Sequence, residues 1–325
     1  MNYNTRKHDH LRLYNCTGYE NSLEKIRIDY YSIPEFSIDE ISLETIVGGI
    51  KWKYPFFINS ITAGYDLDDI NRDFYEICKK EEIMFFAGSI SPFLKSNKYE
   101  KYISDSVNIG LDKNPKYLYN ILDSINPKYI QLHANLIQEI VMPEGDKNFG
   151  EWLCNLEDIV KNVNIPIIFK ETGFGINDYT INKVIELGIK VIDISSKGGT
   201  DFSAIENKRR ELQNIRKIDY FDEIGYNLFE SLKIAEKYKN DIDILASGGI
   251  SSPLDVVKSL AFGAKAVGVS RYFLDILLNK GSDELHREIK EWKTELKYLY
   301  LITNSRTTSD LYGKVRVLNE CKCFE

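Results

Sequence analysis

Residues 131–146, QLHANLIQEIVMPEGD, place side chains able to do chemistry beside an apolar run. Within them, His133, Asn135, Gln138 and Glu139 supply an imidazole, two amides and a carboxylate. A strand and its following loop could use such groups to anchor themselves by hydrogen bonds, with the histidine in the core. The same groups could instead bind a polar ligand or transfer protons. The residue types alone leave both interpretations open.

Residues 246–270, ASGGISSPLDVVKSLAFGAKAVGVS, read as a strand, a Gly248-Gly249 turn, a helix and a further strand. Glycines expose backbone N–H groups, and a helix N-terminus adds positive potential, so this pattern can bind a phosphate. The alternative is that the glycines only make a tight turn.

A lysine, Lys170, ends the apolar run PIIF. It could hold a negative charge or the electron-rich end of a flavin. It could also form an ion pair with Glu171 or Asp193.

Eight short runs are almost continuously apolar, as strands buried on both faces of a parallel sheet are. They are residues 55–61, 84–89, 107–111, 129–135, 166–171, 191–196, 243–248 and 266–270. Helical patterns separate them, with expected N-caps at Asp66 and Asp178 and C-terminal glycines at Gly188 and Gly263. Alternating strands and helices predict an α/β fold, a (β/α)8 TIM barrel.

The pattern predicts one domain over residues 1–325, with an N-terminal arm or cap (1–54), the barrel and a closing helix (55–311), and a tail (312–325). Residues 201–240 exceed one crossover and predict an insertion. Each predicted strand ends in polar residues, and catalytic groups of barrels gather at these ends.

Composition excludes several classes of protein. The net charge of −7 argues against general affinity for nucleic acid or acidic membranes. No apolar run approaches the length of about 20 residues that a membrane helix needs, and the first residues lack the centre of a signal peptide. Five scattered cysteines, including Cys321 and Cys323 near the end, are typical of reduced thiols in the cytoplasm.

The chain resembles the type 2 isopentenyl-diphosphate isomerases, FMN-dependent barrels that interconvert isopentenyl and dimethylallyl diphosphate. The most specific stretch is LHANLIQEIVMPEGDKNFGEWL, supported by KETGFG, GGTDFSAIENKRR and ASGGISSPLDVVKSLAFGAKAVGV. The resemblance runs from Arg6-Lys7 to about Leu311. It implies FMN and Mg²⁺ as cofactors, NAD(P)H as reductant, and a homo-oligomer, a tetramer or larger ring.

The resemblance implies that Gln138 contacts the diphosphate substrate and that Glu139 binds Mg²⁺, which commonly bridges a carboxylate and phosphates. Catalytic residues would be His133, Gln138 and Glu139. Substrate-binding residues would be Arg6, Lys7, His10, Ser89, Asn135 and Gln138.

The implied flavin site spans most strand ends, with Lys170 and Thr62 near N1 and O2 of the ring and Ser270-Arg271 at the phosphate. Its members are Ser60, Ile61, Thr62, Ser89, Asn108, Lys170, Thr200, Gly248, Gly249, Ser251, Ser270 and Arg271. Reduced FMN would then exchange protons with the substrate without net redox change.

Several positions depart from the family pattern. Ile90-Ser91 replaces a Gln-Arg pair expected at the diphosphate, a charge that Lys95 could restore. Ser195-Ser196 replaces Gly-Gly, and Ser251 replaces an Arg, which Arg271 could compensate at the phosphate. These changes keep two rivals open: an FMN-dependent oxidoreductase with a different substrate, and a non-catalytic flavin- or partner-binding barrel.

Overall fold

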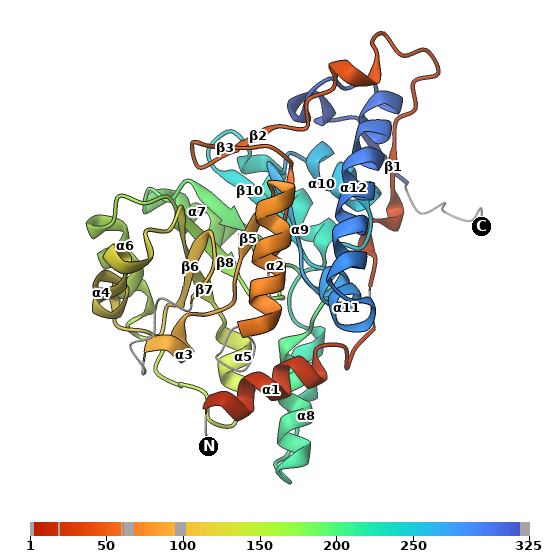
Figure 1. Cartoon of the computed structure of the whole chain (residues 1–325). Coiled ribbons are helices and arrows are strands. Elements are labelled where there is room, and N and C mark those ends of the chain that lie inside the picture. The colour runs from red at the N-terminus through yellow and green to blue at the C-terminus, as the bar shows by residue number, and fades with distance from the viewer. Residues whose placement is uncertain (1–2, 19, 60, 62–67, 95–101, 319–325) are drawn as a thin grey trace, which may run out of the picture.

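The computed structural model describes residues 3–18, 20–59, 61, 68–94 and 102–318. Its centre is an eight-stranded parallel barrel (Figure 1). Every predicted strand is present, and most strand residues are buried because the inner face packs in the barrel and the outer face lies under helices. The strands are β4 (Phe56–Asn59), β5 (Met84–Phe86), β6 (Ser106–Gly110), β7 (Tyr129–Ala134), β8 (Ile167–Glu171), β9 (Val191–Asp193), β10 (Asp243–Ser247) and β11 (Ala266–Val269).

The strand order is β5-β4-β11-β10-β9-β8-β7-β6, so the two ends of the sheet meet between β5 and β6. Isolated hydrogen bonds close this seam. Asp105 N donates to Phe85 O at 2.9 Å, and Ile90 N donates to Asn108 O at 2.8 Å. The predicted (β/α)8 barrel is confirmed.

Helices follow the strands on the outside of the barrel (Figure 1). The insertion predicted in 201–240 contains two of them, α8 and α9. The bounds are α2 (Asp68–Glu81), α3 (Ser91–Leu94), α4 (Pro115–Ile125), α5 (Leu136–Val141), α6 (Trp152–Asn162), α7 (Asp178–Glu186), α8 (Phe202–Leu212), α9 (Leu228–Ala235), α10 (Pro253–Ala261), α11 (Arg271–Lys280) and α12 (Ser282–Ile302).

The ends of α7 show how local sequence sets the helix bounds. Asn177, not the predicted Asp178, is its N-cap, and the Asn177 side chain accepts a hydrogen bond from Thr180 N at 2.9 Å. Gly188 lies just past the helix at φ +85°, a conformation that suits glycine. Gly263 has the same role after α10, at φ +95°. Asp66 lies outside the described residues.

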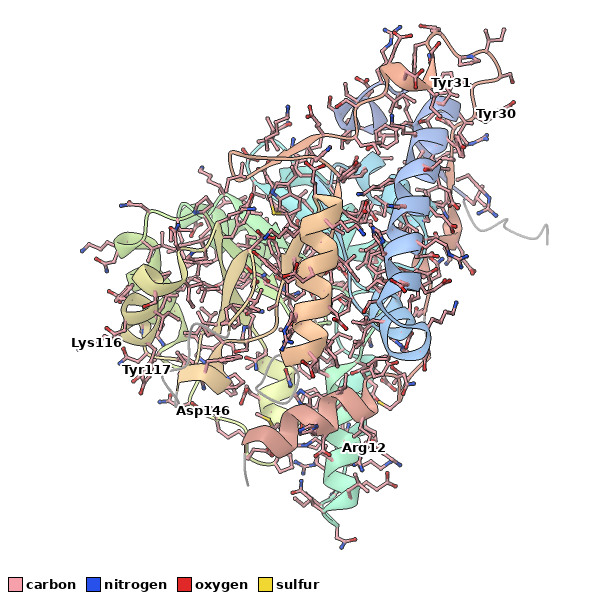
Figure 2. The ribbon with its side chains drawn as sticks, viewed as in Figure 1. Arg12, Tyr30, Tyr31, Lys116, Tyr117 and Asp146 are labelled. Carbon is pink, nitrogen blue, oxygen red and sulfur yellow. The ribbon has the colours of Figure 1, made fainter. Side chains whose placement is uncertain are left out.

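The N-terminal region covers both ends of the barrel. The hairpin of β2 (Thr45–Val47) and β3 (Ile50–Trp52) packs in one buried cluster with Tyr129, Val191 and Ala266, the first residues of three strands. Helix α1 (Tyr3–Leu13) lies at the other end, against α8 (Figure 1). The loop with the exposed Tyr30 and Tyr31 projects far from α1 (Figure 2).

Residues 315–317, predicted to lie in a tail, form β12 (Val315–Val317), antiparallel to β1 (Ile26–Ile28). This pairing ties the C-terminal region to the segment that follows α1. Among the described residues, no helix has the length and apolar character needed to cross a membrane.

Candidate functional site

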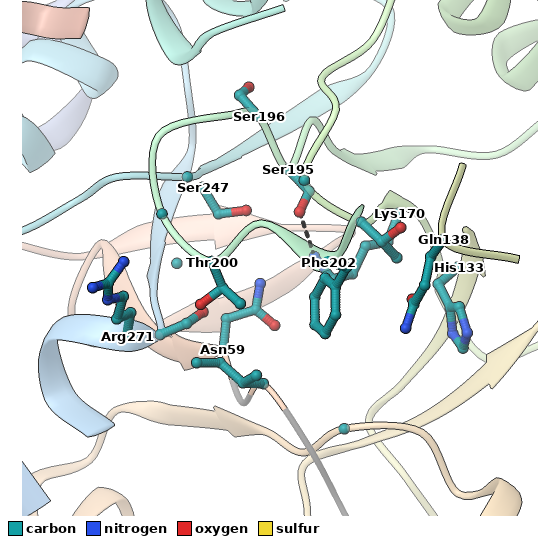
Figure 3. A pocket seen from close by; sticks show the side chains of 18 of the residues that line it. Asn59, His133, Gln138, Lys170, Ser195, Ser196, Thr200, Phe202, Ser247 and Arg271 are labelled. Atoms are coloured by element: carbon teal, nitrogen blue, oxygen red, sulfur yellow. Dashed lines mark hydrogen bonds between the residues drawn. The ribbon is translucent and has the colours of Figure 1, made fainter. Parts of the chain in front are cut away.

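A hollow opens at the carboxyl ends of the barrel strands. We call it the central hollow (Figure 3). All eight strands or the turns that follow them contribute to its wall, through Asn59, Gly88, Asn108, His133, Lys170, Ser195, Ser247 and Gly268.

The floor of the central hollow is organised around Asp193, a carboxylate only 1% exposed. Lys170 Nζ lies 3.0 Å from its Oδ2, and Asn59 Nδ2 donates to the same oxygen at 2.9 Å. Ser247 Oγ donates to Oδ1 at 2.7 Å. Four strands are thereby joined at one buried charge. The ion pair considered for Lys170 exists, yet Lys170 also lines the hollow.

Lys170 has a second partner. Its Nζ donates to Ser195 Oγ at 3.0 Å (Figure 3). An ammonium group has three donors. Asp193 and Ser195 therefore orient the lysine without exhausting its hydrogen-bonding capacity.

The next residue on β8, Glu171, has a perturbed acidity. Burial of its carboxyl group raises its pKa to about 8, although hydrogen bonds from Phe174 N (2.6 Å) and Thr172 N (2.5 Å) oppose the shift. A carboxyl group with this pKa can carry a proton near neutral pH.

His133 and Gln138 form another side of the hollow (Figure 3). His133 Nδ1 is 2.7 Å from Asn108 Oδ1, so the imidazole donates there and its Nε2 is the remaining ring nitrogen. Gln138 is 9% exposed on the short helix α5. An amide here can both donate and accept without adding charge.

The turns after β9 and β10 form the glycine-rich side of the hollow. Gly248 and Gly249 have φ values of +113° and +75°. A Cβ on Gly248 would lie 2.1 Å from Ser196 O, so no side chain fits there. Among the described residues, the buried hydroxyls of Ser196 and Thr200 lack a hydrogen-bond partner. Such hydroxyls suit a polar ligand in the hollow.

Two residues predicted at the cofactor phosphate have protein partners. Arg271 lines the hollow, but its Nη1 donates to Thr17 O at 2.7 Å. Ser251 is not among the lining residues, and its backbone N donates to Asp255 Oδ2 at 3.1 Å. The Asp255 carboxylate caps this turn, and the cofactor contact expected of Ser251 stays a prediction.

A second hollow, which we call the side hollow, shares Ser89, His133 and Gln138 with the central one. It also contains Glu139, whose Oε1 accepts from Asn135 Nδ2 and whose Oε2 accepts from Asp146 N, both at 2.8 Å. Glu139 is held at the hollow and is 6% exposed.

The side hollow is acidic. Asp112, Glu144 and Asp146 accompany Glu139, with Lys113 paired to Asp112. The described residues contain no group of three or more His, Cys, Asp or Glu side chains arranged to hold a metal by themselves. Any divalent cation here would need further ligands from water or a bound molecule.

Helix α1 reaches the central hollow through His10. Its Nε2 lies 2.7 Å from Oε1 of Glu206 on α8, and both residues are buried. Arg209, also buried, pairs with Glu206, with Asp9 at 3.3 Å and with Glu144 at 2.5 Å. This network fixes the N-terminal arm beside the hollow.

The predicted residues can now be placed. Ser60 and Thr62 lie outside the described residues, as do Lys95, Cys321 and Cys323, and the side chains of Arg6 and Lys7 are not described. Asn135 and Glu139 line the side hollow. Those that line the central hollow are His10, Ile61, Ser89, Asn108, His133, Gln138, Lys170, Thr200, Gly248, Gly249, Ser270 and Arg271.

Sequence reasoning left several wall residues out of the site. Asn59, Ser195 and Ser247 line the hollow, and Asp193 lies directly beneath it. Their positions at the ends of predicted strands were the sequence feature that could have identified them as site residues. The sequence gives no indication that Ser195 has a left-handed backbone conformation, at φ +28°.

Comparison with known proteins defines the class first. The sequence model of the family described as FMN-dependent dehydrogenase matches residues 123–313. The flavin-binding domain of baker's yeast flavocytochrome b2 superposes with a TM-score of 0.68, over 98% of this chain and 85% of that one, at 15% identity. A mandelate oxidase variant superposes with a TM-score of 0.66, over 92% of this chain and 93% of that one, at 14% identity. The fold is that of the FMN-dependent barrel enzymes.

Curated relatives then identify the family. A protein of Streptococcus gordonii named isopentenyl-diphosphate delta-isomerase is 33% identical over 97% of this chain and 98% of its own length. Two further proteins carry the same name. The one from Staphylococcus saprophyticus is 34% identical over 94% of this chain and 91% of its own length. The one from Streptomyces sp. is 33% identical over 94% of this chain and 87% of its own length. The chain belongs to the isopentenyl-diphosphate delta-isomerase family.

Proposed function

We propose that this protein isomerises isopentenyl diphosphate to dimethylallyl diphosphate, with FMN in the central hollow and Mg²⁺ at the side hollow. The observation that carries the proposal is the junction of the two hollows at His133 and Gln138. In a chain of this family, the central hollow at the strand ends adjoins an acidic hollow there. A substrate could contact both at once.

The wall of the central hollow fits FMN. The unpaired hydroxyls of Ser196 and Thr200, the side-chain-free backbone at Gly248-Gly249 and the ammonium of Lys170 are donors suited to a phosphorylated, acceptor-rich cofactor. Lys170 would hold the electron-rich edge of the ring. FMN held here in its reduced form would supply acid/base chemistry for the proton shift on the allylic carbons.

Protein groups would bind and orient the diphosphate substrate. Glu139 supports an Mg²⁺ site because its carboxylate is fixed by Asn135 and Asp146 N, and Mg²⁺ commonly bridges a carboxylate and phosphate oxygens. The acidic side hollow would repel a diphosphate in the absence of such a cation. Gln138 and His133 would lie between diphosphate and ring. Arg6 and Lys7, on the arm pinned by His10, would contact the diphosphate.

A second function remains a candidate, an FMN-dependent oxidoreductase of the same family with another substrate. The loss of the Gln-Arg pair favours it, because Ile90 and Ser91 have uncharged side chains and cannot supply the expected cation. Both side chains are also buried. The presence of both Gln138 and Glu139 at the hollows supports the isomerase.

The test is an assay of purified protein with isopentenyl diphosphate, FMN, Mg²⁺ and NAD(P)H, each omitted in turn. We expect dimethylallyl diphosphate only with the complete mixture, and catalytic rather than stoichiometric use of the reductant. Full turnover without Mg²⁺ would contradict the role of Glu139, and no turnover in any mixture would contradict the proposal.

A further inference from the structure

The side hollow holds a lysine among its acidic groups. Among the described residues that line it, Lys113 is the only lysine or arginine. The carboxylates that it accompanies are those of Asp112, Glu139, Glu144 and Asp146. The turn after β5 also reaches this hollow, through Ser89 and Ser91, and contributes hydroxyls but no charge. An anion that enters the hollow therefore depends on Lys113 for attraction by a side chain of the wall.

The turn after β6 places Lys113 near the junction of the two hollows. Lys113 N donates to Gly110 O at 3.1 Å, and Leu111 N donates to His133 O at 3.2 Å. A Cβ on Gly110 would lie 2.3 Å from Asp112 Oδ1 and 3.0 Å from His133 Nε2, so the carboxylate and the imidazole lie together beside this glycine. His133 lines both hollows. The partner of Asp112 is thus held close to their junction.

The Lys113 side chain is paired and still accessible. Its Nζ forms an ion pair with the Asp112 carboxylate, and the two side chains are 32% and 8% exposed. Because an ammonium has three donors, Lys113 can bind Asp112 and an anion at the same time. The buried carboxylate keeps the ammonium at the side hollow, as Asp193 keeps Lys170 at the central one.

Two other cations near the side hollow bind groups of the protein. Lys147 Nζ donates to Ile140 O and Met142 O, both at 3.1 Å, at the end of α5. Arg209 pairs with Glu144 at 2.5 Å and is 1% exposed. Neither is among the described residues that line the hollow. These two cations stabilise the wall, whereas the lysine of the β6 turn faces the space inside it.

We propose that Lys113 binds the diphosphate group of the substrate in the side hollow. A diphosphate carries more negative charge than one Mg²⁺ balances, and an ammonium forms strong charge-assisted hydrogen bonds with phosphate oxygens. This inference rests on the proposed diphosphate substrate but not on the isomerisation itself, so the two can fail separately.

The test measures the binding of inorganic diphosphate, with Mg²⁺, to the FMN-loaded protein by isothermal titration calorimetry. Lys113→Met removes the charge and should weaken this binding at least about tenfold, as expected for a lost hydrogen bond to a charged group. Lys113→Arg should bind within about threefold of wild type. Lys116→Met, at an exposed position on the neighbouring helix α4 (Figure 2), is the matched control and should bind as wild type does.

A double variant separates direct contact from charge balance. In Lys113→Met the Asp112 carboxylate loses its partner and would itself repel diphosphate. Asp112→Asn combined with Lys113→Met removes both charges, so the hollow keeps its wild-type net charge. If Lys113 contacts the diphosphate, this double variant should still bind at least about threefold more weakly than wild type. Recovery of wild-type affinity would show that Lys113 only neutralises Asp112, and the proposal would be wrong.

Steady-state kinetics distinguish this inference from the proposed function. In an active enzyme, Lys113→Met should raise the KM for isopentenyl diphosphate about tenfold, with kcat within about threefold of wild type and unchanged FMN content. Isomerase activity in wild type, together with unchanged diphosphate binding in Lys113→Met, would overturn this inference alone. Diphosphate binding that needs Lys113 in a protein without isomerase activity would overturn the proposed isomerisation alone. Wild-type protein that neither binds diphosphate nor isomerises would overturn both.

Discussion

At the scale of single residues, Lys170 shows that a side chain can form a buried ion pair and still line a hollow. The sequence left open a flavin contact or an ion pair with Asp193. In the structure the ion pair exists, and the same lysine faces the central hollow. A buried carboxylate that keeps the ammonium in place is a way to orient a donor before the ligand arrives.

Gln138 provides the sharpest test of the junction between the hollows. Gln138→Ala should abolish most isomerase turnover while FMN stays bound, because the side chain lies where the substrate would meet the ring. Steady-state kinetics and the flavin spectrum of the purified variant measure the two effects.

Leu136→Ala, an exposed position on the same helix, is the matched control and should keep activity. A Gln138→Ala variant that loses its flavin would show that residue 138 belongs to the cofactor site instead.

Glu171 should make stability depend on pH. Its folded-state pKa of about 8 lies above the ordinary value of 4.5, so the folded state favours the protonated form. The resulting stabilisation is fully present below pH 4.5 and is lost as pH rises towards 8. Glu171→Gln should flatten this decline in urea unfolding of the apoprotein. An identical pH profile in wild type and variant would rule out the shift.

At the scale of elements, the sequence predicted the strands better than the contacts around them. Apolar runs located all eight barrel strands, since burial on both faces leaves a strong pattern. The contacts made by Arg271 and Ser251 could not be predicted, because their partners, Thr17 and Asp255, depend on how the arm and the turn pack in three dimensions.

The same limit applies to the candidate site. The residue types at 133–139 predicted a polar site, and the structure brings them to adjoining hollows. Asp193 was foreseen only as a partner of Lys170. Its bonds to Asn59 and Ser247 arise from barrel closure, which joins residues more than fifty positions apart.

We expect Arg209 to hold the N-terminal helix α1 against α8, through its ion pairs with Asp9 and Glu206. Arg209→Ala would leave the Glu206 carboxylate buried without this cation, a loss of about 3 kcal/mol in the free energy of unfolding. The detached arm should also be cleaved faster by a protease near residues 8–18. Lys208→Ala, an exposed position on the same helix, should leave both properties unchanged. Equal cleavage of wild type and Arg209→Ala would argue that other contacts hold α1.

At the scale of the whole molecule, one end of the barrel is closed by packing and the other end is open to ligands. The β2–β3 hairpin seals one end, where Trp52 Nε1 donates to Tyr129 Oη at 2.8 Å and the indole packs edge-on against Phe57 and Phe86. The other end carries both hollows. The homo-oligomer predicted from the family resemblance stays a prediction, which light scattering after size exclusion would test.

Trp52→Ala should therefore separate stability from binding. The cavity left in this cluster should lower the free energy of unfolding by about 3–5 kcal/mol, while FMN affinity of the folded protein is preserved. Denaturant unfolding and flavin titration measure the two quantities, with the exposed neighbour Lys51→Ala as control. A large loss of FMN affinity in folded Trp52→Ala protein would mean that the two ends are coupled.

The central claim is that flavin and diphosphate meet at the junction of the hollows without net electron transfer. The most direct measurement is anaerobic NMR of isopentenyl diphosphate incubated with reduced, FMN-loaded protein and Mg²⁺, with the flavin absorbance recorded in parallel. We predict many turnovers to dimethylallyl diphosphate while the flavin remains reduced. Flavin oxidation in step with substrate conversion, or an unchanged substrate, would contradict this account.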